Sequence, residues 1–320
     1  MKMWRAALAV ATAGSLFSLA SCAAYSDAPA TSASAPGTGT GTVQVAVAFY
    51  PFQFIAERIG GDLVDVENLT APGAEPHDLE LTPQQVASLS TVDLVVYQSG
   101  FQPAVDTAVE QAKPARTVDT ASFLTLLKAS SDGAEDEDHD ADDHDHGADD
   151  PHTWLDPTNM VTVAEHVRDA LTEARPADAD AFAANTTALI ADLTDLDATL
   201  KADLTGCRIQ PFITSHAAFG YFAKRYGLTQ IGINGVEPDV EPSAARIAQV
   251  QQIAKDNGVT TIFFETLVSP VVAQSVAGDL GLKTAVLDPL EGITSASPGA
   301  DYLEVMRANG SALKEANQCS

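Results

Sequence analysis

Three histidines and one aspartate in this 320-residue sequence could together bind a metal ion. Each follows a predicted strand or a turn-rich loop, and both halves of the chain contribute: His77, His152, His216 and Asp288. In open α/β sheets ligands bind beyond the carboxyl ends of the strands, so side chains at these places can face one crevice. Three imidazoles and one carboxylate form a tetrahedral set that suits zinc, whereas manganese prefers more oxygen ligands. The four residues are too far apart to form a local motif, so their meeting depends on the fold.

Strands alternate with helices in both halves of the chain. In the N-terminal half the hydrophobic pattern predicts strands at 43–48, 64–69 and 94–97 and helices at 51–59 and 82–89. In the C-terminal half it predicts strands at 211–214, 259–264 and 283–287 and helices at 217–226, 243–258 and 269–281. This alternation predicts an α/β fold with parallel sheets and helices on both faces.

A long amphipathic helix separates the two halves. Large apolar residues recur at helical spacing over about residues 178–204: Phe182, Leu189, Leu193, Leu196, Leu200 and Leu204. At 1.5 Å per residue this helix is about 40 Å long. It either forms a rigid spine that joins two lobes or packs wholly on one of them.

The N-terminus has the pattern of a bacterial export signal. Lys2 and Arg5 precede the uncharged, apolar residues 6–20, and the following Ser21-Cys22 completes a sequence that looks like a lipobox. We expect residues 1–21 to be a lipoprotein signal peptide and Cys22 to be lipidated. An ordinary signal peptide with an incidental cysteine is the alternative. The Ala-, Ser-, Thr- and Gly-rich residues 22–42 then form a flexible tether.

Export places the remaining two cysteines, Cys207 and Cys319, in an oxidising compartment. They can form a disulfide that attaches the C-terminal tail to the rest of the protein. The alternatives are two free buried thiols or thiolate ligands for a metal ion, although the cysteines lack the close spacing of typical zinc sites.

The chain is strongly acidic, with 17 Lys and Arg residues against 44 Asp and Glu residues and a formal charge of −27. This charge argues against nucleic acid as a partner. Eleven of the acidic residues fall between Asp132 and Asp150. Residues 130–149 have no bulky apolar side chain, and we expect a disordered loop. Its histidines, His139, His144 and His146, either collect zinc weakly or belong to a solvated acidic insert.

Four segments of the sequence resemble the metal-binding segments of the zinc/manganese solute-binding lipoproteins of bacterial ABC importers. They are residues 71–78 (APGAEPHD), 150–157 (DPHTWLDP), 214–221 (TSHAAFGY) and 286–290 (VLDPL). The resemblance runs in order from about Val43 to the C-terminus and includes the long helix. It is closest to the zinc-binding, ZnuA-like branch.

The resemblance implies that His77, His152, His216 and Asp288 bind a metal ion in a cleft between two lobes joined by one rigid helix. Manganese-type members carry Glu at the position of His216, so this resemblance favours zinc as the cargo. Zinc-type members also have a His-rich loop before the second ligand segment, whereas the loop here has more Asp than His.

Other residues near the predicted ligands are candidates for supporting roles. Glu265 ends a predicted strand and is a candidate for orienting an imidazole or serving as a spare ligand, with an unrelated loop carboxylate as the alternative. The aromatic side chains of Tyr50, Trp154 and Phe219 are expected to line the cleft.

The predicted protein is a receptor of several parts. They are the signal peptide, the tether, an N-terminal lobe at 43–158, a helical connection at 159–205 and a C-terminal lobe at 206–320. We expect a monomer, anchored outside the cytoplasmic membrane by lipid on Cys22, that captures zinc and delivers it to an ABC permease.

Alternative functions are a manganese-preferring receptor of the same class and a surface metal buffer or adhesin. An enzyme is not expected. A zinc hydrolase needs an open coordination position, which Asp288 as fourth ligand would fill, and the sequence has neither a His-Glu-x-x-His nor a Gly-x-Ser-x-Gly motif.

Overall fold

The computed structural model describes residues 41–129 and 149–320, and residues 41–320 belong to one contact unit. The predicted signal peptide, the lipidation site Cys22 and the predicted loop ligands His139, His144 and His146 lie outside the described residues. In the described part, no helix combines the length and apolar character needed to span a bilayer.

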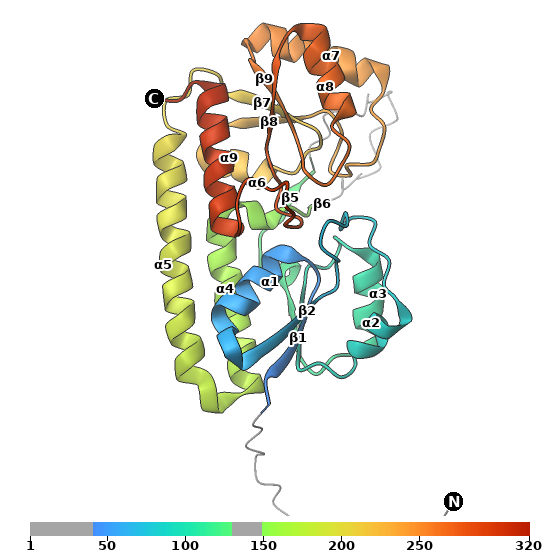
Figure 1. The fold of residues 1–320 in the computed structure, drawn as a ribbon, viewed down its shortest axis with the longest axis vertical. Coiled ribbons are helices and arrows are strands. Elements are labelled where there is room, and N and C mark those ends of the chain that lie inside the picture. Colours follow the sequence, from blue (N-terminus) through green and yellow to red (C-terminus); the bar gives the residue numbers. More distant parts are fainter. Residues whose placement is uncertain (1–40, 130–148) are drawn as a thin grey trace, which may run out of the picture. The chain divides into compact units, whose positions relative to one another are not determined.

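The N-terminal half forms a four-stranded parallel sheet in the order β2-β1-β3-β4 (Figure 1). We call it the N-terminal sheet. Its strands are β1 (Val43–Val47), β2 (Val64–Asn68), β3 (Leu94–Tyr97) and β4 (Thr117–Asp119). The central strands are almost continuously apolar and buried, because helices cover a parallel sheet on both faces.

The C-terminal half repeats this arrangement in a second parallel sheet, ordered β10-β9-β7-β8. We call it the C-terminal sheet. Its strands are β7 (Pro211–Thr214), β8 (Thr229–Gly232), β9 (Thr261–Phe264) and β10 (Lys283–Val286). Numbered along the chain within each sheet, both follow the order 2-1-3-4. The predicted α/β class with two parallel sheets is confirmed.

Side chains alternate across the C-terminal sheet and divide its core in two. Ile213 and Ile262 pack in a small cluster with residues of α7 and α8, whereas Phe212 and Phe263 belong to the large cluster that continues into the N-terminal sheet. One face of this sheet therefore shares its core with the rest of the molecule.

Helices flank the two sheets, and all of them except the one at 103–112, which the sequence pattern does not predict, begin and end close to the predicted residues. Those of the N-terminal half are α1 (Tyr50–Gly60), α2 (Pro83–Ser88) and α3 (Pro103–Ala112), and those between strands of the C-terminal half are α6 (Gly220–Tyr226), α7 (Ala244–Asn257) and α8 (Val271–Leu280). Ser243 caps α7 by accepting a hydrogen bond from the backbone N–H of Arg246. The predicted helix from residue 217 begins three residues later, at Gly220.

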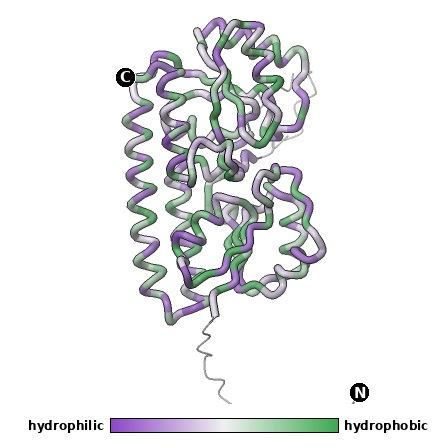
Figure 2. Tube along the Cα trace, viewed as in Figure 1, coloured by the Kyte–Doolittle hydropathy of each residue, from purple (hydrophilic) through white to green (hydrophobic). Residues whose placement is uncertain are grey.

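Three helices connect the halves: α4 (Pro157–Ala174), α5 (Ala179–Asp203) and α9 (Tyr302–Asn317). The long helix α5 buries one apolar face, and Figure 2 shows polar and apolar residues alternating along it. It packs against α1 and α4 and also against α9, which contacts β7 and β10. The prediction of a helix that joins the two halves is confirmed.

A glycine permits the close approach of α5 and α9. A Cβ atom at Gly310 of α9 would lie 2.3 Å from Cδ2 of Leu200 on α5, which no real Cβ contact tolerates. The two helices lie side by side in Figure 1, and Leu200 occupies the space that a side chain at position 310 would need.

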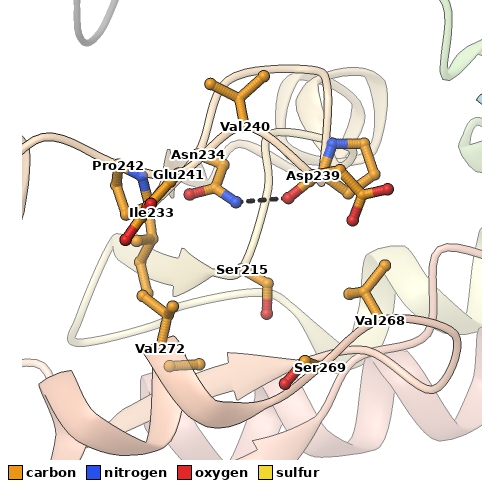
Figure 3. A pocket seen from close by; sticks show the side chains of 12 residues that line it. Ser215, Ile233, Asn234, Asp239, Val240, Glu241, Pro242, Val268, Ser269 and Val272 are labelled. Carbon is orange, nitrogen blue, oxygen red and sulfur yellow. Dashed lines mark hydrogen bonds between the residues drawn. The ribbon is translucent and has the colours of Figure 1, made fainter.

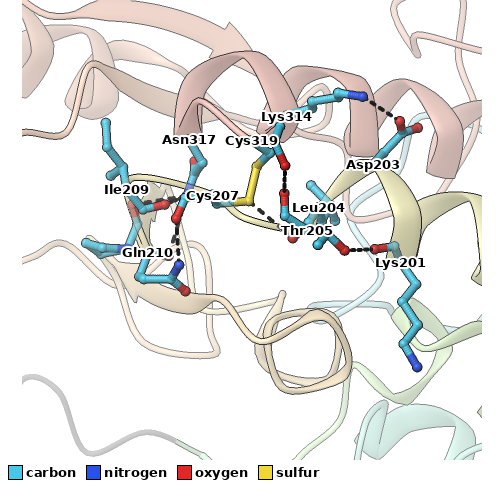
Figure 4. The surroundings of a disulfide bond; sticks show 12 residues. Lys201, Asp203, Leu204, Thr205, Cys207, Ile209, Gln210, Lys314, Asn317 and Cys319 are labelled. Carbon is cyan, nitrogen blue, oxygen red and sulfur yellow. Dashed lines mark hydrogen bonds and ion pairs between the residues drawn. A yellow bond between two sulfur atoms is a disulfide. The ribbon is translucent and has the colours of Figure 1, made fainter.

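A disulfide between Cys207 and Cys319 joins the segments that follow α5 and α9, as predicted (Figure 4). Further contacts surround it. The Asn317 amide donates to the carbonyl of Ile209 at 2.8 Å, and Lys314 pairs with Asp203 at 2.8 Å. The free-thiol and thiolate-ligand alternatives do not apply to these cysteines.

Candidate metal site

His77 lies in the long loop that follows β2 of the N-terminal sheet. Gln102 holds this loop by donating its amide to the carbonyl of Pro76 at 3.1 Å, and the ring of Phe101 packs edge-on against the imidazole at 4.8 Å between centroids. His77 Nδ1 lies 3.3 Å from an oxygen of Glu237, which comes from the loop after β8. The histidine therefore contacts a residue of the other half of the chain.

His152 follows the short strand β6 (Asp149–Asp150), which pairs antiparallel with β5 (Leu127–Lys128). Oδ1 of Asp150 accepts the backbone N–H of His152 at 3.0 Å and lies 2.8 Å from its Nδ1. Gln98 fixes the residue before His152, because its amide donates to the carbonyl of Pro151. A Cβ atom at Gly220 would lie 2.5 Å from Oδ2 of Asp150, so a larger residue at the start of α6 would displace the carboxylate that contacts His152.

His216 lies two residues beyond the end of β7. Its Nδ1 is 2.5 Å from Oε1 of Glu265, and both side chains are almost fully buried. The backbone is fixed as well, because the hydroxyl of Thr214 and the amide of Gln230 both donate to the carbonyl of His216. Glu265 thus occupies the position of a residue that orients an imidazole.

Glu291 brings the three imidazoles together. Its Oε1 lies 3.5 Å from Nε2 of His77, 3.4 Å from Nε2 of His152 and 3.5 Å from Nε2 of His216. The Nε2 atoms of His152 and His216 are 3.2 Å apart. All four side chains are buried, and among the described residues they form the one fully buried group of metal-ligating type.

The structure does not bring Asp288 into this group, although the sequence predicts it as the fourth ligand. Its Oδ1 accepts the backbone N–H of Leu290 at 2.8 Å, and its Oδ2 accepts the hydroxyl of Thr266 at 3.0 Å. The side chain of Asn309 on α9 accepts a hydrogen bond from the backbone N–H of Asp288 and donates one to the carbonyl of Asp288. Leu290 has a left-handed φ of 61°, which turns the chain after Asp288 and places Glu291 at the imidazoles.

The sequence pattern predicts Asp288 and not Glu291, because the prediction relies on residues that come soon after a strand. Asp288 lies two residues beyond the end of β10, and Glu291 lies three residues further on. An aspartate such as Asp288 often accepts the backbone N–H of the residue two positions later and so forms a turn. An acidic residue just after such a turn, here Glu291, is the sequence signal that points to the ligand. The signal is weak on its own, because many turns in proteins have this composition.

The aromatic residues predicted to line the site differ in their placement. The Trp154 ring lies 5.2 Å from that of His152. Tyr50 and Glu291 line a shared pocket of about 190 Å³. Phe219 is buried and packs against other phenylalanine rings rather than against a histidine.

The charges at the site stabilise one another. Burial alone would lower the pKa of His77, but contacts with Glu237 and Glu291 raise it to about 9. The pKa of His216 is also raised despite burial, chiefly by Glu265. Burial alone would raise the pKa of Glu291, but the surrounding imidazoles hold it well below its usual range. The imidazoles and the Glu291 carboxylate therefore stabilise each other's charged forms.

The geometry of the four residues fits zinc. A tetrahedral zinc ion with bonds of about 2.0–2.1 Å separates its ligand atoms by about 3.4 Å. The four separations between Glu291 Oε1 and the imidazole nitrogens, or between imidazoles, are 3.2 to 3.5 Å. Both carboxylate oxygens of Glu291 and both ring nitrogens of His77 are buried without a hydrogen-bond partner. A cation bound at the Nε2 atoms would satisfy atoms that otherwise cost free energy.

Two sheets of the same topology, a connecting helix and a buried group of three histidines and one glutamate define a metal-binding α/β protein with two lobes. Residues 45–316 match the family described as zinc-uptake complex component A, periplasmic. The chain belongs to this family.

Known relatives bear out the family. The chain is 34% identical over 273 residues to the zinc-binding lipoprotein AdcA of Streptococcus pneumoniae, covering 83% of this chain and 54% of that protein. It is 36% identical to the high-affinity zinc uptake system protein ZnuA of Bacillus subtilis, covering 83% and 85%. The chain therefore spans about half the length of AdcA and most of that ZnuA.

A solved structure shares the fold. The Zn(II)-bound ZnuA-like domain of Streptococcus pneumoniae AdcA matches with a TM-score of 0.72 and 33% identity, covering 87% of this chain and 99% of that domain.

Proposed function

We propose that this protein is an extracytoplasmic receptor that captures zinc and delivers it to an ABC-type metal importer. The observation that carries the proposal is the burial of three imidazoles and one carboxylate whose ligand atoms all lie within 4.8 Å of one another. The distances of Glu291 Oε1 to the three Nε2 atoms, and the distance between Nε2 of His152 and Nε2 of His216, are close to those in a tetrahedral zinc site. The family and the zinc-binding names of the relatives support the same cargo.

In this proposal His77, His152, His216 and Glu291 bind the ion, and Asp288 shapes the turn that presents Glu291. Three nitrogen ligands and one oxygen ligand favour zinc over manganese, which prefers more oxygen ligands. The protein acts by binding without turnover. All four tetrahedral positions are taken by side chains, which leaves no place for the water molecule that a zinc hydrolase activates.

The attachment to the membrane is a further part of the proposal. Lipid on Cys22 would hold the receptor at the outer face of the cytoplasmic membrane, with residues 23–42 as the tether and a permease as partner. We propose a monomer. Residues 130–149 would raise the local zinc concentration or collect zinc weakly, and the tight site does not depend on them.

Competitive titration of zinc against manganese tests the function. We would use the chain from Ala23 onwards, with and without residues 131–149. One zinc ion per chain in both forms, undisplaced by excess manganese, is the expected result. A preference for manganese, or loss of the tight site when the loop is deleted, would contradict the proposal.

A further inference from the structure

Each of the three imidazoles has a carboxylate at its Nδ1, but the three carboxylates are not equivalent. Glu265 and Asp150 have side chains only 3% and 6% exposed and lie at 2.5 and 2.8 Å from their histidines. Glu237 has a side chain 59% exposed and lies at ion-pair distance, 3.3 Å, from Nδ1 of His77, without the hydrogen bond that the other two pairs form. A carboxylate at the far ring nitrogen fixes the tautomer and the orientation of a metal-binding imidazole. His77 is therefore the least firmly oriented of the three.

Glu237 belongs to the segment 234–242, which is fixed at its start. The backbone N–H of Asn234 donates to the carbonyl of Ser215 at 2.8 Å, and that of Ala217 donates to the carbonyl of Gly235 at 2.8 Å. These bonds attach the beginning of the segment to the residues on either side of His216. The Asn234 amide also donates to the carbonyl of Pro238 at 2.6 Å.

The rest of the segment borders unfilled space. A pocket of about 230 Å³ is lined by residues 238–242 of the segment and by Val268, Ser269 and Val272 of the neighbouring connection and helix (Figure 3). Val240 is 60% exposed, so little apolar packing holds this part of the segment in place. The segment has room to move while its start stays attached beside His216.

The segment meets the loop of His77 with one attractive and one repulsive contact. Glu237 pairs with His77, whereas carboxylate oxygens of Asp239 and Asp78 lie within 4.8 Å of each other. Like charges at this distance repel. The contact between Glu237 and His77 works against this repulsion, so its loss favours separation of the two segments.

We propose that Glu237 is a positioning residue that orients His77 and sets the rate at which zinc leaves the site. This inference rests on the proposed function. Four buried ligands explain capture but not release. When the segment moves away, His77 loses its orienting carboxylate while His152 and His216 keep theirs. His77 is then the first ligand to leave the ion, and the outward movement of the segment opens the site on that side.

The test is the rate of zinc dissociation into an excess of chelator, measured on the full chain. Glu237→Gln keeps the size of the side chain and removes its charge, and we expect zinc to leave about tenfold faster, the lower end of the effect of removing an orienting partner. Asp239→Asn is the matched control, because it makes the same charge change on the same segment without contact to His77. It is expected not to accelerate release.

A spectroscopic readout separates orientation from general loosening. In long-range ¹H–¹⁵N spectra of the histidine rings, His77 of the zinc-loaded wild-type protein is expected to show one tautomer protonated at Nδ1, because Nε2 then binds the ion. Glu237→Gln should disturb the His77 signals and leave those of His152 unchanged, and Glu237→Asp should restore part of the wild-type pattern.

The outcomes distinguish the inference from the function. Wild-type release rates and unchanged His77 signals in Glu237→Gln, in a wild-type protein that binds one zinc tightly, would overturn the inference alone. Absence of tight zinc binding by the wild-type protein would overturn the proposed function. Equal acceleration by Asp239→Asn would show that segment charge, and not orientation of His77, sets the rate.

Discussion

The two sheets share a strand order but contribute different chemistry to the site. The N-terminal half supplies two imidazoles, His77 and His152, whereas the C-terminal half supplies one imidazole and the carboxylate of Glu291. The loops differ too: His216 lies two residues beyond its strand, and His77 lies nine residues beyond β2. A repeated topology thus provides two equivalent edges, and the loops decide which ligand each edge presents and how firmly.

The two sheets also differ in how they are stabilised. The N-terminal sheet lies wholly within the large core cluster, whereas one face of the C-terminal sheet has a small cluster of its own. The C-terminal sheet is joined to the rest of the molecule through its other face, and α9 connects this sheet to α5. The following predictions test first the division of chemistry and then this attachment.

Replacing Glu291 should have the largest effect. Glu291→Gln removes the charged oxygen ligand, and zinc affinity should fall by more than the roughly 10–100-fold that loss of an orienting partner costs. Asp288→Asn is the control, because an amide oxygen can still accept the N–H of Leu290, and its affinity should stay near wild type. His216→Ala should be as severe as Glu291→Gln. Calorimetric titration with zinc measures all three, and a reversed order for Glu291 and Asp288 would restore Asp288 as the ligand.

Removing the disulfide should destabilise the protein without affecting the site. Replacing both Cys207 and Cys319 by Ser should lower the free energy of unfolding by about 2–4 kcal/mol, because the unfolded chain is no longer constrained. Urea denaturation of the zinc-free protein measures this change, and zinc titration serves as control. A large loss of affinity would mean that the far end of α5 is coupled to the metal site.

Gly310→Ala tests the packing of α5 on α9. The added Cβ would lie 2.3 Å from Cδ2 of Leu200, so we expect a loss of about 1–3 kcal/mol from overpacking. Leu200→Ala in the same chain removes the clash, and the double variant should lose less than the sum of the two single changes. If the losses in free energy of unfolding, measured by urea denaturation, are additive, residues 200 and 310 are not in steric conflict.

The smallest effect is expected at the ion pair between Asp197 on α5 and Arg225 on α6. The two charged bonds measure 2.8 and 2.6 Å, but Arg225 is one-third exposed, so Asp197→Asn should cost at most about 1 kcal/mol. The hydrogen bond from Arg225 lowers the pKa of Asp197 below its ordinary value of 3.8. The ion pair therefore stabilises the folded protein fully at pH values above 3.8, the ordinary pKa of Asp197. This stabilisation is lost as the pH falls through the lowered pKa that Asp197 has in the folded protein. The difference between variant and wild type should be smaller at pH 3 than at pH 7, and a larger difference in acid would contradict this assignment.

The sequence by itself determined many of the strands and helices and pointed to the three histidines, but it did not indicate β4, β8, α3 or α9. Local periodicity and caps place α7 between Ser243 and Gly258, and the pattern of leucines predicts α5 to within one residue at each end. The three histidines were predicted to meet from their places after strands or in loops, but only His216 directly follows a strand of a parallel sheet. His77 lies nine residues beyond β2, and His152 follows the antiparallel strand β6. The two cysteines of the folded part paired because export leaves them oxidised.

Only the tertiary structure decided which carboxylates face the imidazoles. Asp288 and Glu291 are three residues apart, and the choice between them depends on a left-handed residue at Leu290 and on bonds from Asn309 in α9. The pairing of His77 with Glu237 joins segments 160 residues apart in the chain. Local sequence sets hydrophobic period and turns, but the direction of a side chain at a shared edge is set by packing between distant segments.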